Sequence, residues 1–170
     1  MVNFPDSNYF IINNVIACLF AICYGYQFLF IFVSAYKRNP RFPEAAPGRY
    51  AIMICARNEE AVIGQLIDTI QEQEYPQELI DIHIIADNCT DRTADVARAK
   101  GAFVVERQNK ELVGKGYALE CLIDSITKDG TEWAYDGYFV IDADNLLEKH
   151  FVAEMNNAMK GGCRVVTAYR

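Results

Sequence analysis

The sequence predicts an α/β domain with a mostly parallel sheet flanked by helices, preceded by one apolar helix long enough to span a membrane. From residue 50 onward, short apolar runs alternate with amphipathic stretches, which is the pattern of strands connected by helices in a parallel sheet. Polar clusters directly follow several of these apolar runs. An uncharged apolar run at residues 15–36 comes first, and it is too long for a strand.

The run at residues 15–36 predicts a transmembrane helix because it contains no charged side chain. At about 1.5 Å of rise per residue, its length is roughly the 30 Å of a bilayer's hydrocarbon core. Lys37, Arg38 and Arg41 follow it, whereas residues 1–14 contain no lysine or arginine. The positive-inside rule therefore places residues 1–14 outside the cytoplasm and the folded domain inside it.

Two other interpretations of this run are weaker. A cleaved signal peptide has positive charge before a shorter apolar core, which is the reverse of the order in this chain. A buried core helix of this length, rich in tyrosine and phenylalanine, would be unusual in so small a domain.

The rest of the chain divides into a linker, residues 37–49, and a domain, residues 50–170. Pro40, Pro43 and Pro47 predict that the linker is extended. The net charge of -7 falls almost entirely on the part of the chain after the apolar run, which argues against nucleic acid as a partner. The six cysteines contain no Cys-x-x-Cys pair and are expected to be free thiols in a reducing compartment.

Each element of the domain follows from the spacing of its apolar residues. Residues 50–56 (YAIMICA) are uniformly apolar and predict a buried strand, and residues 60–73 then show the three- and four-residue spacing of a helix. The alternation continues with strands at residues 79–86, 102–106, 138–141 and 164–168, and helices at residues 93–100, 116–127 and 151–160. The last strand ends without a closing turn, so we expect the domain to be truncated, the N-terminal portion of a longer one.

Polar clusters follow three predicted strands, at residues 57–60, 87–91 and 142–145, and should face one crevice at the carboxyl edge of the sheet. In the last cluster, Asp142 and Asp144 resemble a DXD motif. On an extended backbone they point the same way and repel each other, unless Mg²⁺ or Mn²⁺ binds both and shares its other positions with phosphate oxygens. The structural alternative is that Asp142 caps a turn and Asp144 begins the next helix.

Asp87 ends the second predicted strand, where a carboxylate can accept hydrogen bonds from a base or a ribose. Asp91 or Thr93 is expected instead to cap the following helix. Lys115, between two glycines, is either a solvated lysine on a flexible loop or a cation that meets a diphosphate at a helix N-terminus. The spacing around it is not that of a P-loop.

Three further side chains are expected to be structural. His83 lies inside the second predicted strand and His150 in a polar turn, and neither has histidine or cysteine neighbours at metal-ligand spacing. Trp133 lies near Tyr135 and Tyr138, and we expect it to pack at the edge of the domain.

Taken together, four stretches resemble the motifs of the family-two glycosyltransferases, which are membrane-associated inverting enzymes with a GT-A fold. They occur in the order and at the spacing of that family between residues 50 and 145. The four stretches are residues 52–60 (IMICARNEE), 84–93 (IIADNCTDRT), 114–119 (GKGYAL) and 139–144 (FVIDAD).

The resemblance implies an enzyme that transfers a hexose from a nucleoside-diphosphate donor, usually a UDP-sugar, to a saccharide, lipid or protein hydroxyl. It implies Mg²⁺ or Mn²⁺ as the cofactor. It further implies that Lys115 lies near the nucleotide or diphosphate, and that Asp142 and Asp144 hold the diphosphate through the metal. The base and ribose would be held by Ala56, Arg57, Glu59 and Asp87.

The sequence also departs from the family pattern. Cys55 stands where many relatives have proline, and Asn88 and Cys89 where many have an acidic residue, glycine or serine, so the donor stays open. The family's catalytic base follows the DXD motif at a distance that places it beyond residue 170, and we expect the chain not to transfer sugar alone.

Two alternatives stay open. One is a membrane-anchored module that binds sugar nucleotides without catalysis. The other is a phosphotransferase of the haloacid-dehalogenase type, although there the aspartate pair follows the first strand of the domain, and here it follows the fourth predicted strand.

Overall fold

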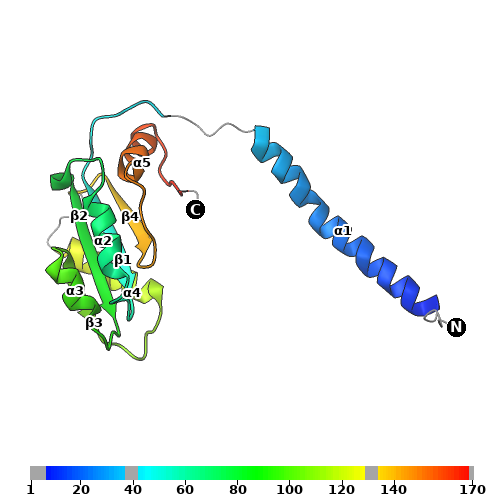
Figure 1. Ribbon diagram of the computed structural model, residues 1–170, viewed down its shortest axis with the longest axis horizontal. Coiled ribbons are helices and arrows are strands. Elements are labelled where there is room, and N and C mark those ends of the chain that lie inside the picture. Colours follow the sequence, from blue (N-terminus) through cyan, green and yellow to red (C-terminus); the bar gives the residue numbers. More distant parts are fainter. Residues whose placement is uncertain (1–6, 37–41, 129–133, 169–170) are drawn as a thin grey trace. The chain divides into compact units, whose positions relative to one another are not determined.

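The computed structural model describes residues 7–36, 42–128 and 134–168, and it divides into two compact units, Met1–Arg41 and Phe42–Arg170 (Figure 1). In the first unit, α1 (Ser7–Tyr36) begins before the apolar run and includes Asn14, whose side-chain amide donates to the carbonyl of Phe10 (2.8 Å). Within the described ranges, the segment Tyr9–Ser34 is long and apolar enough to cross a membrane.

The second unit contains a four-stranded sheet whose strands are all parallel (Figure 1). Its strand order is β3-β2-β1-β4. The chain therefore moves outward from β1 to β3 and then returns past β1 to β4. The four strands are β1 (Tyr50–Ala56), β2 (Ile80–Asp87), β3 (Phe103–Arg107) and β4 (Gly137–Asp142). They confirm the parallel sheet and its first four strands.

Helices cover both faces of this sheet, as predicted. On one face, α2 (Ile63–Gln71), α3 (Thr93–Ala99) and α5 (Phe151–Lys160) pack with alternate side chains of the strands into the larger core. On the other face, α4 (Lys115–Thr127) packs into a smaller core with Met53 and Ile85. A short 3₁₀ helix, Gln77–Leu79, precedes β2.

The fifth strand predicted at residues 164–168 is wrong, because these residues form no strand. They lie beside β4 across a hollow of about 480 Å³, which Tyr138, Val140 and Val166 help to line. Val165 is 87% exposed. Val166 packs partly buried against the larger core, but an apolar run this short becomes a strand only if a neighbouring strand pairs with it, and none of the described strands does here.

Part of the predicted linker packs against the domain. Asn156 of α5 is buried, and its carboxamide oxygen accepts hydrogen bonds from the amide of Gly48 (3.1 Å) and the hydroxyl of Tyr50 (2.9 Å). The neighbouring Asn157 accepts from the amide of Ala45 (2.9 Å). The chain is thus tied to α5 just before it enters β1.

The two histidines lie away from the carboxyl edge of the sheet. The Nε2 atom of His83 lies 3.1 Å from the hydroxyl of Tyr135, its ring stacks on Phe103, and burial lowers its pKa. His150 is exposed, and its ring nitrogen lies 3.5 Å from a carboxylate oxygen of Glu74. Trp133 lies outside the described residues.

Candidate functional site

A cavity of about 200 Å³ opens at the carboxyl ends of β1 and β2 and the start of α4. It lies at the carboxyl edge of the parallel sheet, the edge where open α/β sheets bind their ligands, and it adjoins the point beside β1 where the strand order reverses. Four of the seven predicted site residues line it. The lining consists of Cys55, Ala56, Arg57, Asp87, Gly114, Lys115 and Ala118.

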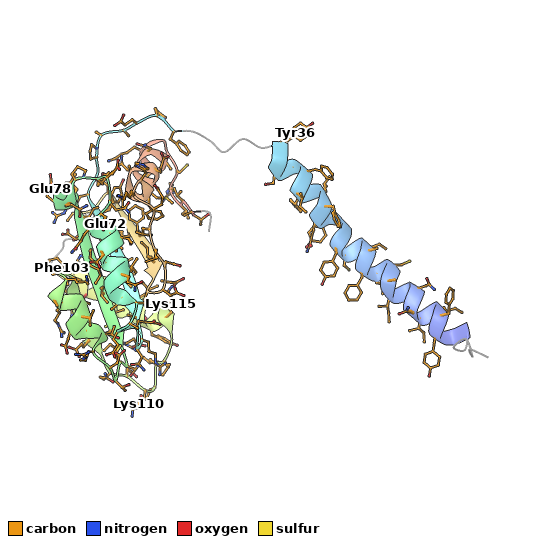
Figure 2. The ribbon with its side chains drawn as sticks, viewed as in Figure 1. Tyr36, Glu72, Glu78, Phe103, Lys110 and Lys115 are labelled. Carbon is orange, nitrogen blue, oxygen red and sulfur yellow. The ribbon has the colours of Figure 1, made fainter. Side chains whose placement is uncertain are left out.

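Asp142 joins this group through an ion pair with Lys115. The Nζ atom of Lys115 donates to Oδ1 of Asp142, and the two side chains are 49% and 40% exposed. Lys115 is the first residue of α4, and Figure 2 shows it at the end of the loop that also carries Lys110. Gly114 before it has a φ of 142°, a conformation that glycine adopts without strain.

Asp144 lies in the exposed turn after β4, two residues beyond Asp142. The main-chain carbonyl of Asp142 accepts a hydrogen bond from the amide of Asn145 (3.2 Å), so a turn forms here. The alternative that Asp144 begins the next helix is wrong, because α5 begins only at Phe151. Among the described residues, no three His, Cys, Asp or Glu side chains are grouped to hold an ion by themselves. Magnesium often binds one or two carboxylates together with substrate phosphates, and Asp142 and Asp144 fit that kind of donor set.

Asp87 is held by an arginine that the sequence pattern did not single out. The Nη1 atom of Arg107, the last residue of β3, lies 2.6 Å from Oδ1 of Asp87, and the two side chains are 10% and 8% exposed. The two residues face each other in the parallel register of β2 and β3. The sequence did contain a signal for this pair, because a basic residue ends the third strand and an acidic residue ends the neighbouring second strand.

Asparagines join the loops that follow the strands. Asn58 and Asn88 adopt φ values of 57° and 53°, in the left-handed region that asparagine tolerates better than most residues. The side-chain oxygen of Asn58 accepts from the amide of Thr90 (2.8 Å), and that of Asn88 accepts from the amide of Asn109 (2.9 Å). The loops after β1, β2 and β3 are therefore linked in series.

Glu59 does not line the cavity. Its amide donates to the hydroxyl of Thr93 (2.8 Å), and its carbonyl accepts from the amide of Ile63 (2.9 Å) at the start of α2. The carboxylate of Asp91 accepts from the hydroxyl of Thr93 (2.6 Å) and from the amide of Glu60 (3.1 Å). The hydrogen bond from the Thr93 hydroxyl lowers the pKa of Asp91. Arg92, and neither of the two predicted residues, stands at the N-cap position of α3, and it makes no side-chain cap hydrogen bond within the described part of the chain. Asp91 accepts instead from the amide of Thr93 (3.0 Å) at the start of the helix, and both residues fasten the loop after β1.

Cys55 lines the cavity as a neutral thiol. Burial raises its pKa to about 11, Lys115 opposes the shift, and the carboxylates of Asp87 and Asp142 add to it. Such a thiol is a poor nucleophile at neutral pH.

Residues 47–170 match the model of the family described as Glycosyltransferase like family 2. The chain belongs to this family. The match covers the whole sheet and every residue assigned to the site, and the resemblance inferred from the four motifs is confirmed.

Solved glycosyltransferases share the fold. A mannosyltransferase from Pyrobaculum calidifontis, in complex with GDP-Man and Mn²⁺, superposes with a TM-score of 0.66 at 20% identity over 84% of this chain and 42% of its own. Glucosyl-3-phosphoglycerate synthase from Mycobacterium tuberculosis, in complex with Mn²⁺, UDP and phosphoglyceric acid, has a TM-score of 0.52 at 28% identity over 68% of this chain and 42% of its own. The predicted GT-A fold is confirmed.

A curated relative is similar over a shorter stretch. The 4,4'-diaponeurosporenoate glycosyltransferase of Staphylococcus aureus is 47% identical over 55 residues, which is 32% of this chain and 14% of the relative. The chain thus matches less than half the length of each of these glycosyltransferases.

Proposed function

We propose that this domain supplies the donor site of an inverting glycosyltransferase: it binds a nucleoside-diphosphate sugar, with UDP as the preferred nucleotide, whose hexose is transferred to an acceptor hydroxyl. The observation that carries the proposal is the cavity at the carboxyl edge of the sheet, where Ala56, Arg57, Asp87 and Lys115 meet and Lys115 pairs with Asp142. Family membership supports the reaction type. The 28% identical synthase, solved with UDP and Mn²⁺, supports the choice of nucleotide.

Each site residue has a part in this proposal. The backbone at Ala56 and the side chains of Arg57 and Asp87 bind the base and ribose, and Lys115 brings a positive charge to the diphosphate. Glu59 acts on the nucleotide through the loop that it shares with Arg57, since its own side chain is not part of the cavity lining.

Asp142 and Asp144 would hold Mg²⁺ or Mn²⁺. When bound, the metal supplies positive charge that stabilises the departing diphosphate. In an inverting transfer the acceptor hydroxyl attacks the anomeric carbon opposite the leaving group, and a base removes its proton. None of the assigned residues is that base, so we propose that these 170 residues bind the donor without transferring its sugar.

We also propose that Tyr9–Ser34 anchors the protein in a membrane, with the domain on the cytoplasmic side next to Lys37, Arg38 and Arg41. Protease digestion of sealed vesicles tests this orientation, because the domain should be cleaved only from its own side. The acceptor belongs to one of three classes: saccharide, lipid or protein.

Calorimetry of the detergent-solubilised chain tests the donor site. We expect Mn²⁺ to strengthen UDP binding and Asp144→Ala to remove most of that gain, while the nucleotide still binds. Asp124→Ala, which removes an exposed aspartate on α4, is the matched control and should change nothing. Parallel titrations with GDP decide between the nucleotides. A UDP affinity that changes neither with Mn²⁺ nor in Asp144→Ala would contradict the proposal.

A further inference from the structure

The ion pair between Arg107 and Asp87 is the most buried charged contact beside the cavity. Its two side chains are 10% and 8% exposed, against 49% and 40% for Lys115 and Asp142. Asp87 lines the cavity, whereas Arg107 does not. Arg107 therefore contacts the carboxylate without being part of the cavity lining.

The hydrogen bonds of Asp87 leave one of its oxygens free to meet a ligand. Oδ1 accepts from Nη1 of Arg107 (2.6 Å) and from the side-chain amide of Asn88 (3.1 Å). Among the residues that the structure describes, no hydrogen bond falls on Oδ2. The hydrogen bonds to Oδ1 fix the rotamer of the side chain, so Oδ2 can accept a hydrogen bond from a ligand.

Arg107 is itself held at a second point. Its Nη2 atom donates to the carbonyl of Leu112 (2.7 Å), and its own carbonyl accepts from the amide of Asn88 (2.7 Å). The planar guanidinium thus bridges two acceptors at a fixed angle, which the single ammonium of a lysine cannot reproduce. The carbonyl of Leu112 belongs to the loop that leads to Gly114 and Lys115, so the same side chain links both ends of the cavity.

We propose that Arg107 is a positioning residue for the nucleoside part of the donor. It holds Asp87 so that Oδ2 meets an N–H of the base or an O–H of the ribose, and it makes no contact with the donor itself. This inference rests on the proposed function, because it names how that same site selects a nucleotide over a bare diphosphate.

Calorimetry with two probes, UDP and inorganic diphosphate, tests the proposal on the full chain. We expect Arg107→Met to weaken UDP binding at least about tenfold and Arg107→Lys about threefold or more, while diphosphate affinity stays within about twofold. Arg98→Met, which removes an exposed arginine that pairs with Glu106, is the control and should leave both affinities unchanged. In the background of Asp87→Asn, Arg107→Met should weaken UDP binding no further, because both changes act through one carboxylate.

The outcomes separate this inference from a purely structural role. Three results would each overturn it. The first is an equal loss of UDP and diphosphate affinity, and the second is a UDP affinity that neither Arg107→Met nor Arg107→Lys changes. The third is an effect of Arg107→Met that adds to that of Asp87→Asn. If Arg107→Met does not fold, Arg107→Lys keeps the charge and decides the question by its ratio of UDP to diphosphate affinity. A wild-type chain that binds neither UDP nor GDP would overturn the proposed function, and this inference with it.

Discussion

Replacing Lys115 by methionine should strengthen metal binding and weaken nucleotide binding, and these opposite signs make it the sharpest test of the site. Without a ligand, the ammonium of Lys115 neutralises Asp142. A metal ion that binds Asp142 must displace it, whereas a diphosphate gains from its charge. The lysine and the metal therefore compete for one carboxylate.

The magnitude follows from the exposure of the pair. Side chains that are 49% and 40% exposed are well screened by water, and ion pairs of this kind contribute about 0.2–1 kcal/mol. Lys115→Met should therefore tighten Mn²⁺ binding, measured without nucleotide, by at most about fivefold. Loss of a charge-assisted contact of about 1–2 kcal/mol should weaken UDP binding without metal about five- to thirtyfold.

Two measurements check this pair of expectations. Electron paramagnetic resonance of free Mn²⁺ gives the metal affinity, and calorimetry gives the UDP affinity. Lys110→Met removes the same charge from the loop before α4, where Figure 2 shows Lys110 at the outer turn, and it controls for net charge. Metal and UDP affinities that both fall, or that both stay at the wild-type value, would refute the competition between Lys115 and the metal.

Three further predictions concern the domain around the site. Asn156→Ala should lower the free energy of unfolding by about 1–3 kcal/mol in a urea titration, because it leaves the buried hydroxyl of Tyr50 without its acceptor, whereas the amide of Gly48 keeps the hydroxyl of Tyr75 (2.6 Å). Gln65→Ala, on the exposed side of α2, should have almost no effect. Burial lowers the pKa of His83 from its ordinary 6.5, so its contribution to the free energy of unfolding is complete above pH 6.5 and is lost as the pH falls toward the lower folded-state pKa. In a plot of the free energy of unfolding against pH, His83→Gln should reduce the slope below pH 6.5. A slope that the substitution leaves unchanged would exclude His83 as its source. With a pKa of about 11, Cys55 should react with iodoacetamide at pH 8 at least about tenfold more slowly than a thiol of ordinary pKa 9.0, and equal labelling by peptide mass spectrometry would contradict the burial argument.

The part of the site that could be predicted from the sequence is the part determined by backbone direction. Apolar runs located the four strands, and parallel strands bring their carboxyl ends together, so the amino-acid pattern alone assigns Ala56, Asp87 and Asp142 to one edge of the sheet. Lys115 was assigned to the site because it precedes a predicted helix, and in the structure it forms an ion pair with Asp142.

The missed features depend on side-chain pairing across distant segments. Arg107 resembles an ordinary surface arginine at the end of a strand, and only the register of β2 and β3 places it opposite Asp87. Asn58 and Asn88 lie inside recognised motifs, but their loop-to-loop hydrogen bonds depend on backbone conformations that no periodicity reports. The strand expected at residues 164–168 failed for the opposite reason, because an apolar pattern was present without a strand among the described residues to pair with it, although Val166 packs against the core.

Asp87, which lines the cavity, and Asp142, which pairs with Lys115 of its lining, are neutralised in different ways, and this difference matches their proposed tasks. Asp87 pairs with an arginine that is itself fixed at a second acceptor, and removing one member of so buried a pair is strongly destabilising. Asp142 pairs with a half-exposed lysine on the first residue of a helix, where the ammonium can leave at little loss of energy. Recognition of the nucleobase needs a constant geometry. A diphosphate, in contrast, enters with a metal ion that must displace the ammonium of Lys115 from Asp142. In the proposed function, an exchangeable pair beside the diphosphate and a permanent one beside the nucleoside would let the same site select its nucleotide and still admit a metal.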